Sequence, residues 1–197
     1  GGTGVVTIGQ LIGMASHLEG RGCSVLDMAG LAQKGGAVYS HVVLAPSAEE
    51  LLNTRVAMGE ADLVLAGDQV VATSAEAVAR MNPQRTRALV NTDVAPTAAF
   101  VHDRDWALPG GDLQADLGRA CAEVAHLDAA ELAVALLGDA IYANPLMMGY
   151  AYQKGWLPLS EAALLRAIEL NGQQVANNQA AFAWGRRAAH DLQAVQA

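Results

Sequence analysis

Apolar residues recur along the first half of the chain with two different periods. From 5 to 19 they follow the spacing of one helix face, which predicts an amphipathic helix. Shorter runs over 24–28 and 37–45 predict strands. The runs over 62–67 and 87–92 are apolar almost throughout, as in strands of a parallel sheet that are buried on both faces.

Helices are also predicted between these strands. Ser47 has Glu50 three positions later, which is typical of a capped helix start. A further helix is expected over 71–81, ended by Asn82-Pro83. Strands that alternate with helices favour an α/β fold with a doubly wound, mostly parallel, Rossmann-like sheet.

The second half of the chain predicts helices almost exclusively. The expected ranges are 113–125, 129–136, 141–152, 160–170 and 173–192. Pro158 precedes Ser160, a good capping residue for the fourth of these helices. The segment over 141–152 is apolar nearly all round, so it is either a buried helix or an interface with a partner. We therefore expect one domain over 1–197 with a helical C-terminal half.

Composition narrows the classes of function. The chain is 52% hydrophobic and 16% charged, which favours large surfaces buried against partners. A net charge of −8 argues against binding nucleic acid, and no apolar run is long enough to cross a membrane. Cys23 and Cys121 are too few and too far apart for an iron–sulfur or zinc site, and they fit a reducing, cytoplasmic setting.

The chain opens with Gly1-Gly2-Thr3-Gly4, directly before the first predicted helix. Such a turn can hold a phosphate at the helix N-terminus, or it can be a tight turn without a ligand. A nicotinamide site is disfavoured because Thr7 stands where G-x-G-x-x-G requires glycine. Since the turn lacks a preceding strand, we interpret the chain as a fragment of a longer polypeptide whose first strand is missing.

A second glycine turn carries the sharper signal. Gln33 and Lys34 precede Gly35-Gly36, where backbone N–H groups and an ammonium could contact an anion. The alternative is a solvated loop lysine. Ser40 and His41 follow on a strand, where neighbouring side chains point to opposite faces, so they cannot act as a nucleophile and its base. We predict no catalytic residue and no metal ligand in this chain.

Several motifs together resemble the gamma component of 2-oxoacid:ferredoxin oxidoreductases. The opening Gly1-Gly2-Thr3-Gly4 is similar to the second half of that family's first glycine turn. Further matches are Gly35, Gly36, Val38, Ser40, His41 and Val42, then Glu60-Ala61-Asp62-Leu63, Val90-Asn91-Thr92, Asn144 and Gly149. The segments 27–36 and 183–190 resemble the bacterial indolepyruvate branch, in which this domain is often fused within a very large chain.

The resemblance implies a role that composition alone does not give. The family oxidises a 2-oxoacid, transfers electrons to ferredoxin and releases an acyl-CoA. Thiamine diphosphate, magnesium and the iron–sulfur clusters would be held by thiamine-binding and ferredoxin-type partner domains or subunits. In this chain, Lys34 would pair with CoA phosphates, and Thr3, Gly4, Gly35 and Gly36 would donate backbone N–H groups. Ser40 and His41 would position the loop or reach toward the active-site mouth.

Three expectations accompany this interpretation. The isolated chain would be inactive toward 2-oxoacids. It would assemble with the catalytic partners, and a homodimer is a further possibility. The alternative function is a free-standing α/β module that binds a nucleotide or a phosphorylated metabolite and has no redox partner.

Overall fold

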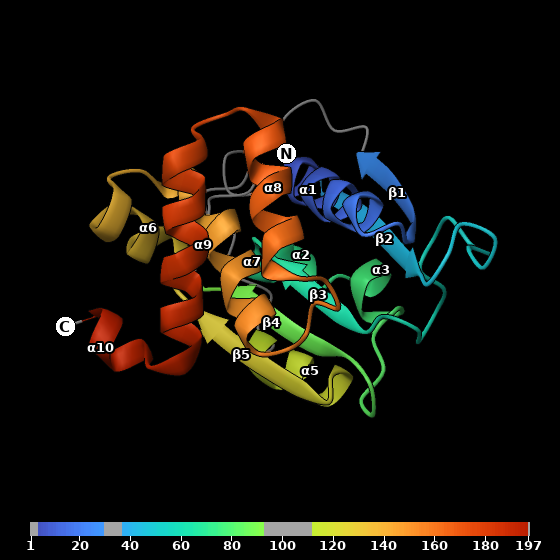
Figure 1. Ribbon diagram of the computed structural model, residues 1–197. Helices are drawn as coiled ribbons and strands as arrows, with labels where there is room; N and C mark the ends of the chain where they lie inside the picture. The colour runs from blue at the N-terminus through green and yellow to red at the C-terminus, as the bar shows by residue number, and fades with distance from the viewer. Residues whose placement is uncertain (1–3, 30–36, 93–111, 197) are drawn as a thin grey trace.

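The computed structural model describes residues 4–29, 37–92 and 112–196 (Figure 1). Its strands are β1 (Gly22–Ala29), β2 (Val38–Ala45), β3 (Leu63–Ala66), β4 (Arg87–Asn91) and β5 (Glu123–Leu127). In the N-terminal half, the helices are α1 (Val5–Leu18), α2 (Gln69–Ala72), α3 (Ala75–Val78) and α5 (Leu113–Ala120). The C-terminal half comprises α6 (Ala129–Leu137), the 3-10 turn η1 (Ala140–Tyr142), α7 (Ala143–Gln153), α8 (Glu161–Asn171), α9 (Val175–His190) and α10 (Leu192–Gln196). The predicted α/β class and helical C-terminal half are confirmed.

Three strands form a small parallel sheet in the order β3-β4-β5. Leu89 of β4 lies opposite Leu65 of β3 on one side and opposite Ala125 of β5 on the other. Ala88, Leu89 and Val90 are completely buried. This confirms the buried parallel strands predicted over 62–67 and 87–92.

The prediction of one doubly wound, mostly parallel sheet is wrong in its N-terminal part. The strand predicted over 24–28 pairs with β2, antiparallel, with Val25 opposite Val42. In the described chain, this β1–β2 ribbon and the parallel sheet are separate (Figure 1). The physical reason is the short connection over 30–37, since a parallel crossover needs about a dozen residues or more whereas an antiparallel pair needs only a short loop.

Strand β5 replaces the end of a predicted helix. The helix expected over 113–125 ends at Ala120, because Cys121 is buried and extended. The Ala122 N–H then donates to the Thr86 carbonyl at 2.8 Å, next to the start of β4. Pairing with β4 outweighs the helical preference of this Ala- and Glu-containing stretch.

Two further helix predictions are corrected by local hydrogen bonds. The helix expected over 71–81 is two short helices, because Asp68 caps α2 and Ser74 caps α3. Capping side chains of this kind compete with a continuous backbone ladder. No helix starts at Ser47, whose hydroxyl instead donates to the Glu50 carboxylate at 3.3 Å.

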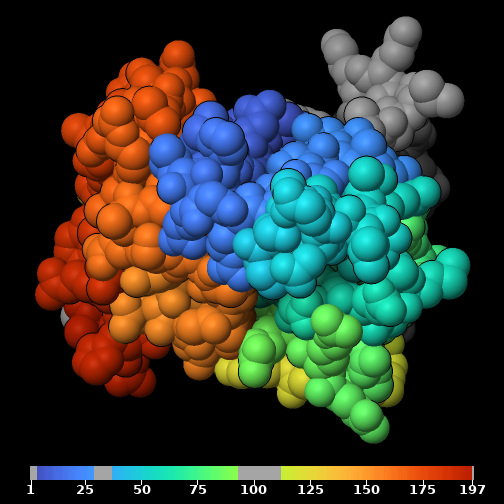
Figure 2. Space-filling view, turned by 45° about the vertical axis from the view of Figure 1, so that its right-hand side comes forward, coloured from blue at the N-terminus to red at the C-terminus, as the bar shows by residue number. Residues whose placement is uncertain are grey.

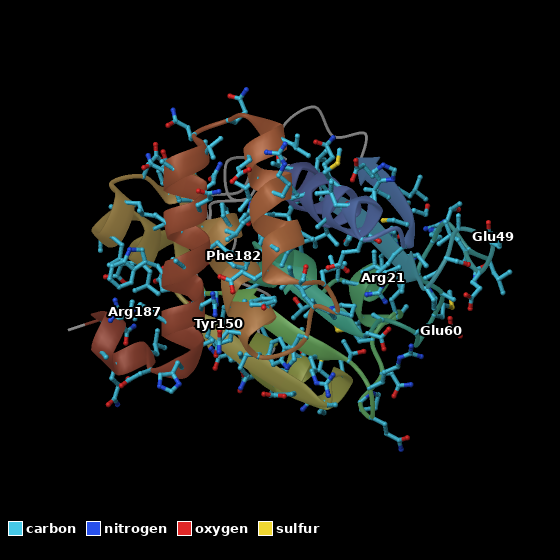
Figure 3. All side chains as sticks on the ribbon, in the orientation of Figure 1. Arg21, Glu49, Glu60, Tyr150, Phe182 and Arg187 are labelled. Carbon is cyan, nitrogen blue, oxygen red and sulfur yellow. The ribbon has the colours of Figure 1, made fainter. Side chains whose placement is uncertain are left out.

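Helices α7 and α9 cross at two glycines. A methyl group on Gly149 would overlap the carbonyl oxygen of Phe182, and one on Gly185 would overlap that of Leu146. Figure 3 labels Phe182 and Tyr150 where these helices meet. Leu146, Met147 and Met148 are 0–2% exposed within the core of this chain. Most of the apolar segment over 141–152 is therefore a helix buried within this chain, which favours the first of the two alternatives predicted for it.

Helix α1 connects the two halves of the molecule. Its inner face joins the main core through Leu11, Ile12 and Ala15. The helix packs on β1, β2 and α8, and Figure 2 shows it between the C-terminal helices and the segment that contains β2. No helix in the described residues is long and apolar enough to cross a membrane.

Candidate functional site

The predicted binding residues are only partly within the described chain. Thr3, Gln33, Lys34, Gly35 and Gly36 lie outside the described residues, so their roles stay predictions. Gly4, Ser40 and His41 are described, as are the residues that flank both glycine turns. These flanking elements fix the position from which each turn starts and ends.

Gly4 is the N-terminal cap of α1 and has a backbone conformation that favours glycine. Its φ of 77° is left-handed, and its carbonyl accepts from the Ile8 N–H at 3.2 Å. A Cβ atom at this position would lie only 2.8 Å from Asn144 Nδ2 at the start of α7. The first turn of α1 contains no acidic side chain. The positive end of this helix dipole is therefore left without a carboxylate from its own first turn.

The open end of the β1–β2 ribbon lies toward this same helix end. Gly13 of α1 packs against Cys23 and Val25, and Gly9, one turn earlier, packs against Val25 and Ser40. The helix and β1 therefore run in opposite directions. The ladder ends with Ala29 opposite Val38, so the residues flanking 30–36 lie toward the N-terminal end of α1. The described residues on either side of 30–36 are therefore directed toward the helix end that Gly4 caps.

Ser40 and His41 lie on opposite faces of β2, as predicted. The Ser40 hydroxyl faces α1, where a methyl group on Gly9 would overlap it. Neither Ser40 Oγ nor His41 Nε2 has a hydrogen-bond partner in the described chain, although both atoms are buried. The two side chains therefore form no hydroxyl–imidazole pair, and Ser40 is placed to set the spacing between β2 and α1.

The surroundings of His41 favour the neutral form of its imidazole. Only 5% of the residue is exposed, and burial lowers the pKa of its imidazole below the ordinary value of 6.5. The charges of Arg80 and Arg55 lower this pKa further, while Glu76 raises it. Glu76 is shared between both arginines, at 3.3 Å from Arg80 and 3.4 Å from Arg55.

The environment of His41 could not be found from local sequence. On the same face of β2, the Tyr39 hydroxyl lies 2.8 Å from Ser74 Oγ, across 35 positions of the chain. Arg80 and Glu76 likewise belong to the α3 region, for which the sequence predicts one longer helix. No motif relates these residues to β2, because only the folded chain brings them together.

Asn91 organises the carboxyl ends of the parallel strands. Its Nδ2 donates to the Gly67 carbonyl at 3.3 Å, and its Oδ1 accepts from the Ala129 N–H at 3.0 Å. These bonds tie the ends of β3 and β4 to the start of α6. In open α/β folds, ligands bind at this edge of the sheet. Asn91 is the asparagine of the Val90-Asn91-Thr92 motif, and the structure shows that it ends strand β4.

The described residues contain no group of three or more His, Cys, Asp or Glu side chains that could hold a metal ion. Cys23 and Cys121 are both unpaired thiols, and burial raises the pKa of each. Within this part of the chain, the geometry supplies backbone and amide groups rather than metal ligands. Such a set suits contact with a polar or anionic ligand.

Comparison with a protein-family model gives a match over residues 1–188 to "Pyruvate ferredoxin/flavodoxin oxidoreductase". The chain belongs to this family. It corresponds to the gamma component of the 2-oxoacid:ferredoxin oxidoreductases and is a subunit or domain of such an enzyme complex.

Individual relatives agree with the family. The chain is 26% identical over 171 residues to an indolepyruvate oxidoreductase subunit, IorB, of Methanothermobacter thermautotrophicus, covering 87% of this chain and 83% of that protein. The fold matches the gamma subunit of a keto/oxoacid ferredoxin oxidoreductase from Geobacter sulfurreducens, with a TM-score of 0.66, 20% identity and coverage of 96% and 94%.

A third similar structure is a 2-oxoglutarate:ferredoxin oxidoreductase from Magnetococcus marinus, with a TM-score of 0.64 and 14% identity. The match covers 96% of this chain but 29% of that one. The same fold therefore occurs there within a much longer polypeptide.

Proposed function

We propose that this family member is the gamma component of an indolepyruvate-type 2-oxoacid:ferredoxin oxidoreductase. In that reaction an aryl 2-oxoacid loses CO₂, its acyl group passes to CoA, and two electrons pass to ferredoxin. Support comes from the family match and from the 26% identity to an indolepyruvate oxidoreductase subunit over most of both chains. Family membership favours this function over a free-standing module that binds a phosphorylated metabolite.

The contribution of this chain is to bind CoA and cover the active site. Two cysteines are too few for the four thiolates of an iron–sulfur cluster. Thiamine diphosphate, which supplies carbanion chemistry, magnesium and the clusters are therefore assigned to thiamine-binding and ferredoxin-type components. We also infer a cytoplasmic location, because both thiols are unpaired and such enzymes need a reducing compartment.

The CoA assignment is supported by the positions of the described residues next to the two predicted glycine turns. Gly4 ends one turn at the N-terminus of α1, and the β1–β2 ladder ends toward that same helix end. From there, Lys34 would supply a positive charge, and Thr3, Gly35 and Gly36 would supply backbone N–H groups to the CoA phosphates. Further support is that the Magnetococcus enzyme, whose much longer chain includes this fold, has coenzyme A and succinyl-CoA bound.

Ser40 and His41 would act as positioning residues for this loop. Ser40 sets the distance between β2 and α1, while His41 anchors the opposite face of β2 beside Arg80. Because the Ser40 hydroxyl and the His41 side chain are both buried, we assign these residues a role in holding the loop rather than in contact with the reacting atoms.

Kinetics of the complete enzyme test the CoA assignment. Lys34→Ala should raise the KM for CoA by roughly 10- to 150-fold, the effect of losing one charge-assisted contact. Reduction of the clusters by the 2-oxoacid in the absence of CoA should stay unchanged. The matched control is Lys154→Ala, which removes the chain's other lysine, an ion-pair partner of Glu123 in the helical half.

Each outcome of this experiment has a distinct meaning. An equal loss in both half-reactions would show that Lys34 supports the active-site architecture instead of binding CoA. No change in either half-reaction would identify Lys34 as a solvated loop residue. A similar rise in KM for Lys154→Ala would show that the effect is not specific to the glycine turns.

A further inference from the structure

Helix α1 carries large apolar side chains on the side that faces solvent, among the polar residues Thr7, Gln10 and His17. Val6, Met14 and Leu18 are 36%, 41% and 43% exposed on its outer face. From 5 to 18 the sequence contains no Asp, Glu, Lys or Arg. A surface helix normally carries charged side chains opposite its buried stripe. The outer face of α1 is therefore unusual for a helix that remains in water.

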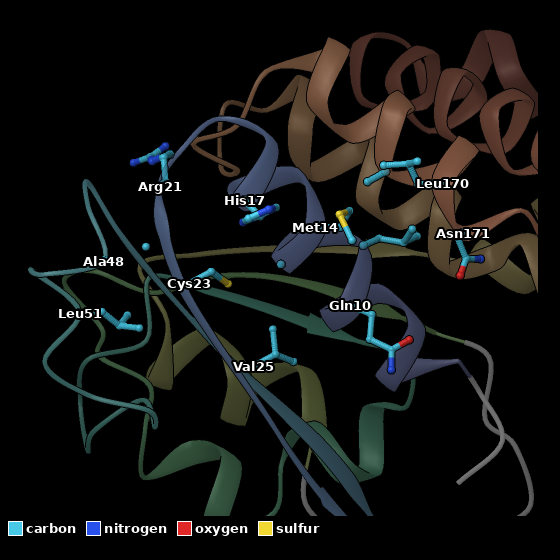
Figure 4. A pocket seen from close by; sticks show the side chains of 14 residues that line it. Gln10, Met14, His17, Arg21, Cys23, Val25, Ala48, Leu51, Leu170 and Asn171 are labelled. Atoms are coloured by element: carbon cyan, nitrogen blue, oxygen red, sulfur yellow. The ribbon is translucent and has the colours of Figure 1, made fainter.

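This face borders a surface groove of about 650 Å³ (Figure 4). We call it the α1 groove. Met14 lies on one side of it and Leu170, 48% exposed at the end of α8, on another. Val25 of β1 and Leu51, which follows β2, supply further apolar surface. Four segments of the chain thus contribute apolar side chains to one concave region.

The charges around the α1 groove indicate the chemistry of its occupant. The chain has 20 acidic and 12 basic residues, yet no Asp or Glu lines the groove. The lining includes Arg21, whose guanidinium donates to the Pro158 carbonyl and has no salt bridge in the described chain. Interface cores are depleted of Asp, Glu and Lys and enriched in Met and Arg. The groove therefore complements an apolar segment that also carries a carboxylate.

Net charge argues against a second copy as the occupant. Each copy carries a charge of −8, and charge of one sign keeps proteins apart. The alternative occupant is a different component of the enzyme. The family assignment establishes that such components exist for this chain.

We propose that the α1 groove is the docking surface for another component of the oxidoreductase. An apolar segment of that component packs against Met14 and Leu170 and places a carboxylate beside Arg21. This inference rests on the proposed function, because that function supplies the identity of the partner.

Cys23 provides a direct reporter in the unmodified protein. Its partly exposed thiol lines the α1 groove, whereas Cys121, the other cysteine of the chain, is buried. A docked segment should make Cys23 in the intact enzyme about as unreactive toward iodoacetamide as Cys121. Dissociating the components should accelerate alkylation of Cys23 by about tenfold or more, as measured by peptide mass spectrometry at alkaline pH. Rapid alkylation of Cys23 in the intact enzyme would overturn the proposal.

Substitutions test the same surface through assembly. Met14→Glu should weaken association with the other components by about tenfold or more, because it places a charge in the centre of the interface. Arg21→Glu should weaken it as well, by charge reversal. The matched control is Met58→Glu, at a residue that is 79% exposed outside the groove, and assembly should then change by less than about twofold. Association is measured by native mass spectrometry at several concentrations.

The remaining outcomes separate this inference from the function on which it rests. Assembly that is unchanged by both groove substitutions would overturn the docking surface and leave the function intact. A concentration-dependent dimer of this chain that Met14→Glu abolishes would identify a second copy as the occupant of the α1 groove. That result would also overturn the proposal that another component docks there. If no thiamine-binding or ferredoxin-type component associates with the chain at all, the proposed function itself fails.

Discussion

The central strand of the parallel sheet is far more buried than the strands of the β1–β2 ribbon. In β4, four of five positions are buried, whereas in β2 only His41 and Ala45 are buried among eight. The central strand of the parallel sheet is thus buried within this chain, whereas its neighbours β3 and β5 are mostly half-buried. The ribbon is covered by α1, and a two-stranded pair is marginally stable by itself. The predicted ligand-binding turn belongs to this less enclosed region.

The difference suggests a division of roles within the chain. Binding residues commonly lie on loops that a rigid scaffold positions. Here the parallel sheet and the C-terminal helices are the scaffold. Helix α1 packs on this scaffold with one face and contacts the ribbon through Gly9 and Gly13. Substitutions in the two regions should therefore differ in size and in the part of the molecule that they affect.

The largest effect is expected for Leu89→Ala in β4. Leu89 is completely buried, so the substitution leaves a cavity and should lower the free energy of unfolding by about 2–5 kcal/mol. Urea denaturation followed by circular dichroism measures this change. Leu52→Ala, at a residue that is 86% exposed, is the control and should stay within about 0.5 kcal/mol. Equal effects at the two positions would contradict the burial of the central strand within this chain.

The regions also differ in how well their sequences predict them. The strands over 62–67 and 87–92 were predictable, because a strand that is buried on both faces of a parallel sheet needs apolar residues at nearly every position. β5 was not, since Glu123 and Ala125 favour a helix locally and only pairing with β4 makes them a strand. The antiparallel pairing of β1 with β2 likewise depends on the length of the connection between them.

The candidate site was predictable in part for a related reason. Glycine turns identify backbone geometry locally, and Gly4 has the left-handed conformation that such a turn requires. The opposite orientation of Ser40 and His41 follows from strand alternation alone. Arg80 and Asn144, in contrast, reach the ribbon and Gly4 from distant segments, so no spacing in the sequence could relate their positions to the site.

A medium effect is expected where α1 contacts the ribbon. Gly9→Ala should lower the free energy of unfolding by about 1 kcal/mol, because the new methyl group meets the Ser40 hydroxyl. In a Ser40→Ala background, the same substitution should be neutral or should stabilise by up to about 1 kcal/mol, since alanine favours the helix. Ser40→Ala alone should change little, because its hydroxyl has no hydrogen-bond partner in the described chain.

A double-mutant cycle by urea denaturation isolates this contact. The matched control is Gly13→Ala, whose methyl group would meet Val25 rather than Ser40, so Ser40→Ala should not rescue it. Additive effects of Gly9→Ala and Ser40→Ala would show that the ribbon tolerates displacement from α1.

The smallest change in stability is expected on lowering the pH, and the ribbon should be the first region to lose protection. In the folded chain, burial and then the charges of Arg80 and Arg55 lower the pKa of His41 below 6.5. The unfolded chain takes up a proton near this ordinary value, while the folded chain resists it. The contribution of neutral His41 to the free energy of unfolding should therefore be fully present above about pH 7. It should be lost as the pH falls through 6.5 toward the lower pKa of the folded chain. The pKa values of Glu19 and Glu169 are also lowered, but from 4.5, so their contributions are lost at more acidic pH.

Substitution separates His41 from every other titrating group. His41→Gln should flatten the dependence of the unfolding free energy on pH between about 7 and 5.5, whereas Leu52→Gln, at an exposed position, should leave it parallel to that of the unmodified chain. Hydrogen exchange shows which part of the chain opens on acidification: exchange should accelerate in β2 while β4 stays protected. Protonated His41 would add a third positive charge beside two arginines that already share Glu76. Simultaneous loss of protection in both strands would mean that the ribbon and the parallel sheet open as one cooperative unit.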